Sequence, residues 1–432
     1  MRSIRVLFYP FLSLLIIACG GCSSENGDDG TGSGTDTGTG QDQTSLIGKV
    51  LPDWEEGYLD IHAINTGRGE STLLIFPDGT TMLNDAAGSL ISPTDAIPPP
   101  AQKPNSSVSP GLAITNFTKH FIKPASNKIN YLMLSHFDPD HMGSFSTSLS
   151  LGPDGTFRMG GITEVGASIP FDILIDRGYP DYDFPTNMTS DSRMANYIKF
   201  IEWAKKQGSI AEQFDVGKND QIILKEDPSK YTNFEVRNIC SNGVVWTGSG
   251  SGSNNTLPSA AEVAAGNGAE NIFSIGFVLS YGKFNYFTAG DLQYNDRSSY
   301  SWKDIEAPVA AVVTAVDVMK ANHHGTGNTN STALLGSLKP QVVLIHPWRD
   351  VQPNPETISR MFTANGSVHI FTTNMTEANK PRLGDNLSKL KAIQGHIVVR
   401  VSPGGDEYYV YVLDDSNQDY IVTGVFGPYK SK

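Results

Sequence analysis

One short segment gathers more metal-binding side chains than a protein core needs. The apolar run Tyr131-Leu132-Met133-Leu134 ends directly before Ser135-His136-Phe137-Asp138-Pro139-Asp140-His141-Met142-Gly143. The run is typical of a buried strand, so the polar residues lie on a loop at the carboxyl end of a sheet, where a rigid scaffold presents functional groups. Imidazole and carboxylate groups bind divalent metals. A solvated loop with two satisfied histidines is the alternative, but the density of ligands favours a metal site formed by His136, Asp138, Asp140 and His141.

Two later segments repeat this arrangement, in which a strand is followed by a ligand and a small residue. A strand predicted over 284–288 leads into Ala289-Gly290-Asp291. Another, over 316–321, leads into Asn322-His323-His324-Gly325. Alone, each could be a simple turn acid or a pair of capping histidines. Their order behind the first segment favours one shared site.

Strands and helices alternate along most of the chain. Strand-like runs cover 59–65, 71–76 and 80–83, and later 171–175, 273–281, 342–345 and 368–372. Helices are predicted over 112–122, over 191–206 and from about Pro355, and a terminal hairpin is predicted around Gly404 and Gly405. Two comparable runs of strands and helices predict an α/β fold, a four-layer αββα sandwich with the sheets inside. We expect long insertions on this core at about 91–125 and 145–270.

The first residues have the features of an export signal. Arg2 and Arg5 precede an apolar run over 6–18 that is too short to span a bilayer comfortably. The run closes on Ile16-Ile17-Ala18-Cys19, which resembles the lipobox of bacterial lipoproteins. The resemblance implies that residues 1–18 are a signal peptide and that Cys19 receives lipid, with Cys22 a weaker candidate. Residues 19–50, rich in Gly, Ser, Thr and Asp, would form a flexible tether to a domain over 51–432.

This arrangement predicts a lipid-anchored lipoprotein of the cell envelope that faces outside the cytoplasm. Gly20 after the cysteine favours the outer membrane if the organism is Gram-negative, by resemblance to lipoprotein sorting rules. Contact with the membrane is expected through the lipid anchor only. Cys240 is the one thiol beyond the lipidation region, so no disulfide framework is expected within the domain. The sequence does not predict an oligomeric state.

The domain is acidic. Of the net charge of −13, the two arginines of the signal give +2 and the acids of 23–44 give −5, which leaves −10 on the remainder. Such a body repels phosphate backbones at long range, and no stripe of Lys or Arg offsets this. Nucleic acid is therefore a disfavoured partner, although a local basic pocket could still bind it.

Together these motifs resemble the metallo-β-lactamase fold, and in particular the branch similar to the extracytoplasmic domain of competence proteins of the ComEC/Rec2 type. The resemblance covers most of residues 58–365. It rests on Asn65-Thr66-Gly67-Arg68-Gly69-Glu70, Asn84-Asp85-Ala86-Ala87-Gly88, the 135–143 segment, Ala289-Gly290-Asp291, Lys320 to Gly325, and His346-Pro347. It does not cover the long middle region or the terminal hairpin.

The resemblance implies a centre of two divalent metal ions, with zinc favoured and manganese accepted. His136 and Asp138 would bind one ion, and Asp140 and His141 the other. Asp291 would bridge them, His324 rather than His323 would complete the second site, and Asp85 would orient the cluster. Asp140 would also orient the attacking hydroxide. His323, Arg177 or Lys320 would give the leaving group a proton or a positive neighbour, although Lys320 is expected to point into the sheet.

Two departures from the family pattern matter. Asp138 stands where lactamases usually have histidine, and an oxygen ligand makes the first site more tolerant of manganese. No histidine occurs between His141 and His323, where many relatives place a ligand. Asp176, at the end of the strand over 171–175, is our candidate for this missing ligand, and a plain turn acid is the alternative.

The function predicted is a secreted, membrane-tethered, metal-dependent hydrolase. A phosphodiesterase acting on a small-molecule or envelope phosphoester is favoured, because the Asp138 variant is typical of the competence branch. Fold and metals alone do not select the substrate, so lactones, lactams and thioesters stay open. The competing class is a noncatalytic surface-binding lipoprotein in which a metal stabilises the fold.

Overall fold

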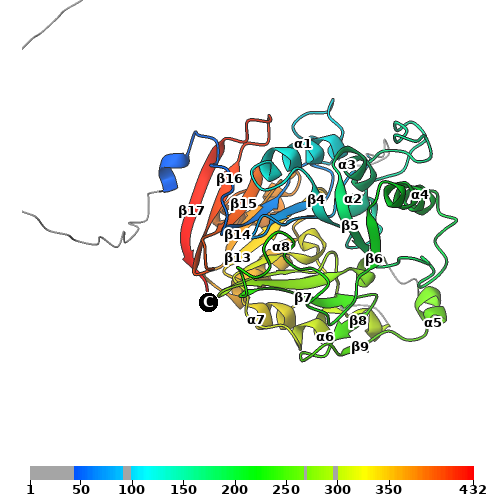
Figure 1. The fold of residues 1–432 in the computed structure, drawn as a ribbon. Helices are drawn as coiled ribbons and strands as arrows, with labels where there is room; N and C mark the ends of the chain where they lie inside the picture. Colours follow the sequence, from blue (N-terminus) through cyan, green and yellow to red (C-terminus); the bar gives the residue numbers. More distant parts are fainter. Residues whose placement is uncertain (1–42, 91–98, 267–269, 295–299) are drawn as a thin grey trace, which may run out of the picture. The chain divides into compact units, whose positions relative to one another are not determined.

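Two mixed β-sheets form the inner layers of the protein in the computed structural model, and helices lie on their outer faces (Figure 1). The structure describes residues 43–90, 99–266, 270–294 and 300–432. The predicted signal peptide, Cys19 and most of the predicted tether lie outside these residues. Within them, no helix is long and apolar enough to cross a membrane.

The first sheet joins the beginning of the domain to its end. In spatial order it contains β17 (Val422–Lys430), β16 (Glu407–Leu413), β15 (His396–Val401), β1 (Leu59–Ala63), β2 (Thr72–Ile75), β3 (Thr81–Asn84), β4 (Ile129–Met133), β5 (Phe171–Asp176) and β6 (Ile210–Gln213). Strands β1 to β3 form an antiparallel meander, whereas β3 to β6 run parallel to one another. The carboxyl ends of β3, β4 and β5 therefore meet at one edge.

The second sheet repeats this design. It contains, in spatial order, β14 (His369–Thr372), β13 (Val342–Ile345), β12 (Val318–Lys320), β11 (Phe284–Thr288), β10 (Gly276–Tyr281), β7 (Phe234–Ser241), β8 (Val244–Trp246) and β9 (Ser253–Asn255). Strands β10 and β11 form the predicted hairpin, and β11 to β14 run parallel. The loops that follow β11, β12 and β13 thus emerge at a common edge, which is where α/β sheets bind ligands.

Polar side chains cap the first turns of five of the helices. The helices are α1 (Pro110–Ile122), α2 (Pro139–Met142), α3 (Ile162–Ser168), α4 (Ser192–Lys206), α5 (Ala260–Ala265), α6 (Glu306–Ala310), α7 (Thr332–Leu338), α8 (Pro355–Ala364) and α9 (Lys380–Leu383). The five with such caps are α1, α4, α5, α7 and α8. Single turns of 3-10 helix are η1 (Gln43–Leu46), η2 (Glu270–Phe273), η3 (Ser301–Lys303), η4 (Asn322–Gly325) and η5 (Gly384–Lys389). The side chain of Ser109 accepts a hydrogen bond from the Leu112 amide at the start of α1, where Pro110 has no amide hydrogen to leave unpaired.

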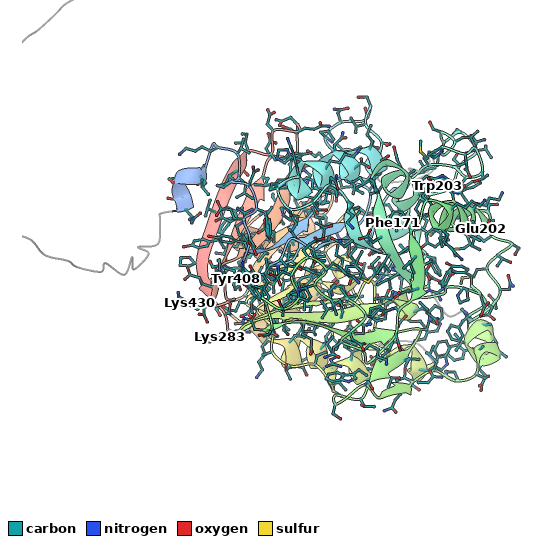
Figure 2. The ribbon with its side chains drawn as sticks, in the orientation of Figure 1. Phe171, Glu202, Trp203, Lys283, Tyr408 and Lys430 are labelled. Carbon is teal, nitrogen blue, oxygen red and sulfur yellow. The ribbon has the colours of Figure 1, made fainter. Side chains whose placement is uncertain are left out.

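Three apolar clusters account for the layers. Side chains such as Tyr131 and Phe277 fill the space between the two sheets. On the outer face of the first sheet, Phe171 packs with residues of α1, α3 and α4, and Figure 2 shows it beside α4 with Trp203. Residues of α6, α7 and α8 cover the second sheet in the same way. Helix, sheet, sheet and helix thus form the αββα sandwich, and this arrangement confirms the predicted four-layer fold class.

The middle of the chain contributes more to the sheets than the sequence indicated. The predicted strand over 171–175 and helix over 191–206 are present as β5 and α4. The expected insertion over 145–270 also supplies β6 to the first sheet and β7, β8 and β9 to the second. Strand β9 and residues of β6 are largely exposed, so neither carries the apolar alternation by which strands are recognised.

Candidate metal centre

The loops that carry the predicted ligands converge at the carboxyl ends of the parallel strands. Strand β4 leads into the loop of His136 and α2, β11 leads into Asp291, and β12 leads into His323 and His324. Ligand atoms of four buried side chains lie within 4.8 Å of one another: Glu70, His141, Asp291 and His324. Three of these were predicted as ligands from the sequence. Glu70 was not, although it ends the Gly-rich turn before β2 that contributed to the family resemblance.

Asp140 approaches this cluster through His324, and three contacts among Asp140, His141, Asp291 and His324 match the donor spacing of a tetrahedral metal site. We call these four residues the second metal half. The Nε2 atom of His141 lies 3.1 Å from Oδ1 of Asp291. The Nε2 atom of His324 lies 3.3 Å from Oδ2 of Asp291 and 3.1 Å from Oδ2 of Asp140. Metal–ligand bonds of about 2.0–2.1 Å at tetrahedral angles place neighbouring donors about 3.3 Å apart.

Buried polar atoms without hydrogen bonds support this interpretation. Among the described residues, Nε2 of His141 and Oδ1 of Asp291 are buried and make no hydrogen bond, although they face one another at 3.1 Å as an ion pair. An unpaired buried polar group costs about 1–3 kcal/mol, so such atoms are rare unless a ligand completes them. The donor chemistry, the spacing and the missing partners all fit a divalent cation.

Asp85 lies behind the second metal half. It follows β3, is fully buried, and accepts hydrogen bonds from the backbone amide and the hydroxyl of Ser135, both at 2.7 Å. Its Oδ2 atom is 2.8 Å from Nδ1 of His141. This contact keeps the imidazole proton on Nδ1 and leaves Nε2 free to bind a metal.

The remaining predicted ligands, His136 and Asp138, form a looser group that we call the first metal half. Their Nε2 and Oδ2 atoms are 3.7 Å apart, and Nε2 of His136 is buried without a hydrogen-bond partner. Asp138 is half-buried. Burial, with the nearby carboxylates of Asp140 and Glu270, raises the pKa of Asp138 to about 7. A cation near Asp138 would stabilise its ionised form.

Asp176 does not join either half. It is fully buried at the end of β5, where Oδ1 accepts the backbone amides of Gly178 and Tyr179 at 2.7 and 2.8 Å. Oδ2 accepts the hydroxyls of Tyr182 and Tyr197 at 2.9 and 3.0 Å. Four donors satisfy this carboxylate, so the structure gives it the turn-capping role that was the alternative interpretation.

A buried ion pair lies under the cluster. The Nζ atom of Lys320 is 2.7 Å from Oε2 of Glu70 and also donates to the carbonyl of Gly290. It lies 3.8 Å from Oδ1 of Asp291. The ammonium of Lys320 therefore neutralises part of the carboxylate charge around the site and is not available to a leaving group.

The two consecutive histidines after β12 are held in an unfavourable backbone conformation. His323 and His324 have φ angles of 46° and 52°, in the left-handed region where side chains other than glycine are strained. This bend turns both rings toward Asp291, with Nε2 of His323 at 3.6 Å and that of His324 at 3.3 Å from Oδ2. Strain of this kind persists where function requires it.

The two rings have different protonation tendencies. Burial lowers the pKa of His323, which keeps its imidazole neutral. Burial also disfavours charge on His324, but the carboxylates of Asp291 and Asp140 outweigh it and raise its pKa to about 9. His324 therefore holds a proton that a metal would displace, as metal binding to histidine requires.

Trp348 is a contact of Asp140 that the sequence did not identify. Its indole Nε1 donates to Oδ2 of Asp140 at 2.8 Å, across 208 residues of sequence. The side chain of Gln352 accepts the backbone amides of Trp348 and Arg349 at 2.9 and 3.0 Å, which fixes the loop. No sequence signal distinguished this tryptophan from one that only packs.

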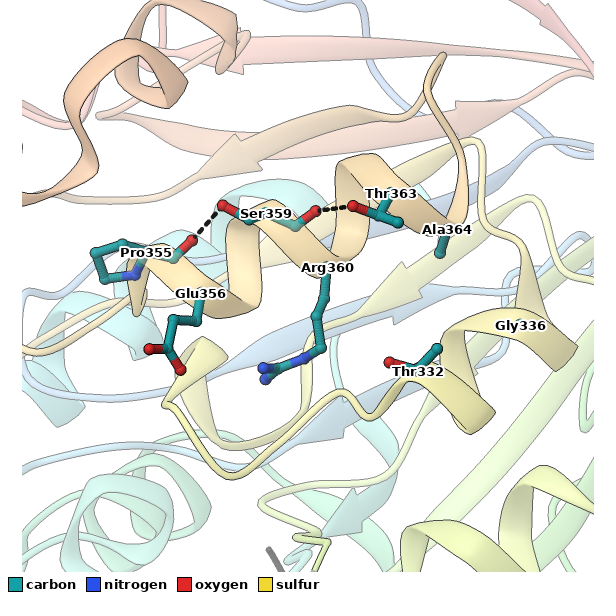
Figure 3. A pocket seen from close by; sticks show the side chains of 8 residues that line it. All are labelled: Thr332, Gly336, Pro355, Glu356, Ser359, Arg360, Thr363 and Ala364. Carbon is teal, nitrogen blue, oxygen red and sulfur yellow. Dashed lines mark hydrogen bonds between the residues drawn. The ribbon is translucent and has the colours of Figure 1, made fainter.

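A separate hollow lies between α7 and α8, away from the ligands. It is lined by Thr332, Gly336, Pro355, Glu356, Ser359, Arg360, Thr363 and Ala364 (Figure 3). Arg360 donates to the carbonyls of Gly327 and Thr329, both at 2.9 Å. Its guanidinium thus holds the loop that follows His324.

The fold and the ligand cluster together define a four-layer αββα protein with a candidate divalent-metal centre. No family model matches the chain, and no curated protein matches it significantly. Several solved hydrolases follow a similar chain path. Igni18, a metallo hydrolase from Ignicoccus hospitalis, is 11% identical over 74% of this chain and 96% of its own, with a TM-score of 0.36.

Two further structures are similar at the same level. Unliganded yeast PDE1 is 10% identical over 80% of this chain and 99% of its own, with a TM-score of 0.36. The isothiocyanate hydrolase from Delia radicum gut bacteria is 12% identical over 80% of this chain and 99% of its own, with a TM-score of 0.34. At these scores the likenesses say nothing of substrate, and the description of the fold rests on the strand order and the layers.

Proposed function

We propose that this protein is a metal-dependent hydrolase, and most plausibly a phosphodiesterase, with two divalent ions in the candidate centre. The observation that carries the proposal is the second metal half, in which three donor pairs stand 3.1–3.3 Å apart and two buried atoms without hydrogen bonds face one another. Zinc suits this mixture of imidazole and carboxylate, and manganese is an alternative where oxygen ligands predominate.

The charge of the site supports two ions better than one. Five carboxyl groups surround it, those of Glu70, Asp85, Asp138, Asp140 and Asp291, and the ammonium of Lys320 and the protonated ring of His324 are opposing charges among them. Like charges in a buried site destabilise one another unless cations neutralise them. The first ion would be held by His136, Asp138 and Asp291, and the second by the second metal half.

Metal ions bound here would supply an acidified water and would neutralise charge that develops on the attacked group. The residues of the chain have distinct tasks around that chemistry. The Oδ2 atom of Asp140, fixed by the indole N–H of Trp348, would orient the nucleophile. His323 is partly exposed, and the N–H of its neutral ring would donate a hydrogen bond to the leaving oxygen.

Phosphodiesters are favoured because Asp138 supplies a hard oxygen ligand in the first metal half. A small-molecule or envelope phosphoester fits the acidic domain better than a nucleic acid does, because its net charge of about −10 repels polyanions. Lactones, lactams and thioesters would be alternative substrates of the same centre.

Metal analysis combined with turnover tests this proposal. Purified protein is expected to contain about two equivalents of divalent metal and to hydrolyse bis(p-nitrophenyl) phosphate. Asp140→Ala should abolish turnover, and Asp419→Ala, at an exposed acid, should leave it unchanged. Protein without bound metal, or turnover that survives Asp140→Ala, would refute the enzymatic role and favour a noncatalytic surface-binding lipoprotein.

We further propose that the hydrolase is tethered to the cell envelope through lipid on Cys19. The support is the lipobox-like segment that ends at this cysteine. Radiolabelled palmitate should enter the native protein and the Cys22→Ser variant but not the Cys19→Ser variant. Label that persists after Cys19→Ser would place the anchor elsewhere.

A further inference from the structure

A fully buried arginine next to the centre is held by an unusually complete set of contacts. Arg177, directly after β5, pairs with both oxygens of Glu270 at 2.6 Å through Nε and Nη2, across 93 residues of sequence. Its Nη1 atom also donates to the side-chain oxygen of Asn242 at 3.0 Å. The guanidinium carbon lies 4.5 Å from the ring centroid of Phe137 and 5.0 Å from that of Phe273.

This ion pair is attached to the loop of the first metal half. Glu270 Oε1 accepts the backbone amide of Phe137 at 2.9 Å. Phe137 stands between His136 and Asp138, so its ring and its amide fix the backbone from which both ligands project. The pair thus contacts this loop in two places. The guanidinium of Arg177 packs on the ring of Phe137, and the carboxylate of Glu270 accepts the backbone amide of the same residue.

The same pair connects the two sheets at the edge where the metals would bind. Arg177 follows a strand of the first sheet, whereas Glu270 lies in η2 immediately before β10 of the second. The residue after Glu270, Asn271, has its amide nitrogen 3.3 Å from Nε2 of His323. A displacement of η2 would therefore move both the metal loop and His323.

Stability alone does not explain such a pair. Removing two charges from water costs several kcal/mol per ion, and an apolar replacement is often as stable. Such pairs are well attested where they fix a geometry. Here the geometry at stake is that of the first metal half, whose predicted third ligand, Asp176, is committed to the turn after β5.

We propose that Arg177 and Glu270 are positioning residues that hold His136 and Asp138 at metal-binding distance, in place of a further protein ligand. The proposal rests on the two-ion centre of the proposed function. The pair acts through Phe137 and touches neither metal nor substrate. Its loss should therefore weaken one of the two ions and spare the other, which the second metal half binds independently.

Zinc titration of the full chain by competition with a chelator tests this. In Glu270→Gln, which keeps an oxygen for the Phe137 amide and loses the charge, the weaker zinc should bind about 10- to 100-fold less tightly. The tighter zinc should be unchanged, and excess zinc should restore two equivalents. Arg177→Lys, which keeps the charge but not the planar two-point contact, should give the same pattern of zinc affinities. This second variant tests the proposal if Glu270→Gln does not fold.

Asp60→Asn is the matched control. Asp60 pairs with Arg400 through two hydrogen bonds of 2.8 and 2.6 Å, and it is more deeply buried than Glu270 and lies on β1 among other contacts. This variant should lose stability and still bind both zinc ions as the wild type does. Two unchanged zinc affinities in Glu270→Gln, or equal weakening of both, would overturn the positioning role.

The two proposals fail in different ways. If wild-type protein binds two zinc ions but hydrolyses no ester, the proposed hydrolase function is refuted. The zinc titration of the variants would then still test the positioning role of Arg177 and Glu270. Wild-type protein that binds a single zinc ion would overturn the positioning role even if it were an active hydrolase.

Discussion

Replacement of Asp85 by asparagine should impair zinc binding through the proton on His141. The backbone amide of Ser135 can only donate, and it lies 2.7 Å from Oδ1 of Asp85. Asparagine must therefore keep its oxygen at that position and place its NH2 group where Oδ2 stands, 2.8 Å from Nδ1 of His141. The imidazole would then accept at Nδ1 and carry its proton on Nε2, the atom that should bind zinc.

The expected cost follows from this tautomer exchange. Loss of a carboxylate behind a metal-binding histidine weakens metal binding by about 10- to 100-fold, which corresponds to about 1.4 to 2.7 kcal/mol. The Ser135 hydroxyl can rotate to accept from the new NH2 group, so the folded protein has one mismatched contact, that to His141. We expect the zinc-free variant to fold.

Chelator competition measures the zinc affinity, and urea denaturation of the metal-free protein measures stability. Asp78→Asn is the control, since Asp78 is also buried and accepts backbone amides, those of Thr80, Glu226 and Asp227, outside the ligand cluster. That variant should lose stability and keep its zinc affinity. If Asp85→Asn bound zinc within threefold of the wild type, the argument from the tautomer of His141 would be wrong.

Two further predictions concern the contact between Trp348 and Asp140 and the pKa of Asp60 on β1. Trp348→Phe keeps an aromatic ring but removes the N–H that donates to Asp140, so turnover of bis(p-nitrophenyl) phosphate should fall about 10-fold. Trp302→Phe, the control, should not reduce turnover. Equal turnover in both variants would exclude a role of the Trp348 indole in orienting Asp140. Burial disfavours charge on Asp60, but Arg400 and His62 outweigh it and lower its pKa from 3.8 to about 2. Its stabilisation, about 2 kcal/mol, is therefore complete above about pH 4 and is lost as the pH falls through about 2. Urea denaturation across this range should show a shallower loss of stability for Asp60→Asn than for the wild type, and identical slopes would contradict the pKa shift.

The sequence predicted the ligand-bearing loops because each feature depends on neighbours along the chain. A buried strand shows itself as an apolar run, and histidines or acids directly after it are presented at the sheet edge whatever surrounds them. Strands β4, β11 and β12 and the residues that follow them were therefore found, and the αββα layering followed from their alternation with helices. The second metal half, Asp140, His141, Asp291 and His324, was proposed from the sequence and stands together in the structure.

The contacts that tune these ligands join segments far apart in the chain, so local patterns could not reveal them. The sequence offered Asp176 as a missing ligand because an acid after a strand has the same local signature whether it binds a metal or caps a turn. Only folding brings Tyr182 and Tyr197 onto its oxygens. The same holds for Trp348 on Asp140 and for Arg177 on Glu270.

The sequence by itself determined which side chains are delivered to the sheet edge, because hydrophobic periodicity and the ends of strands are local properties. The tertiary structure alone decided which of them remain without partners. A carboxylate or imidazole is free to bind a metal only if no other buried donor or acceptor satisfies it, and that depends on side chains from other parts of the chain. Nε2 of His141 and Oδ1 of Asp291 face one another without a hydrogen bond, whereas both oxygens of Asp176 accept hydrogen bonds.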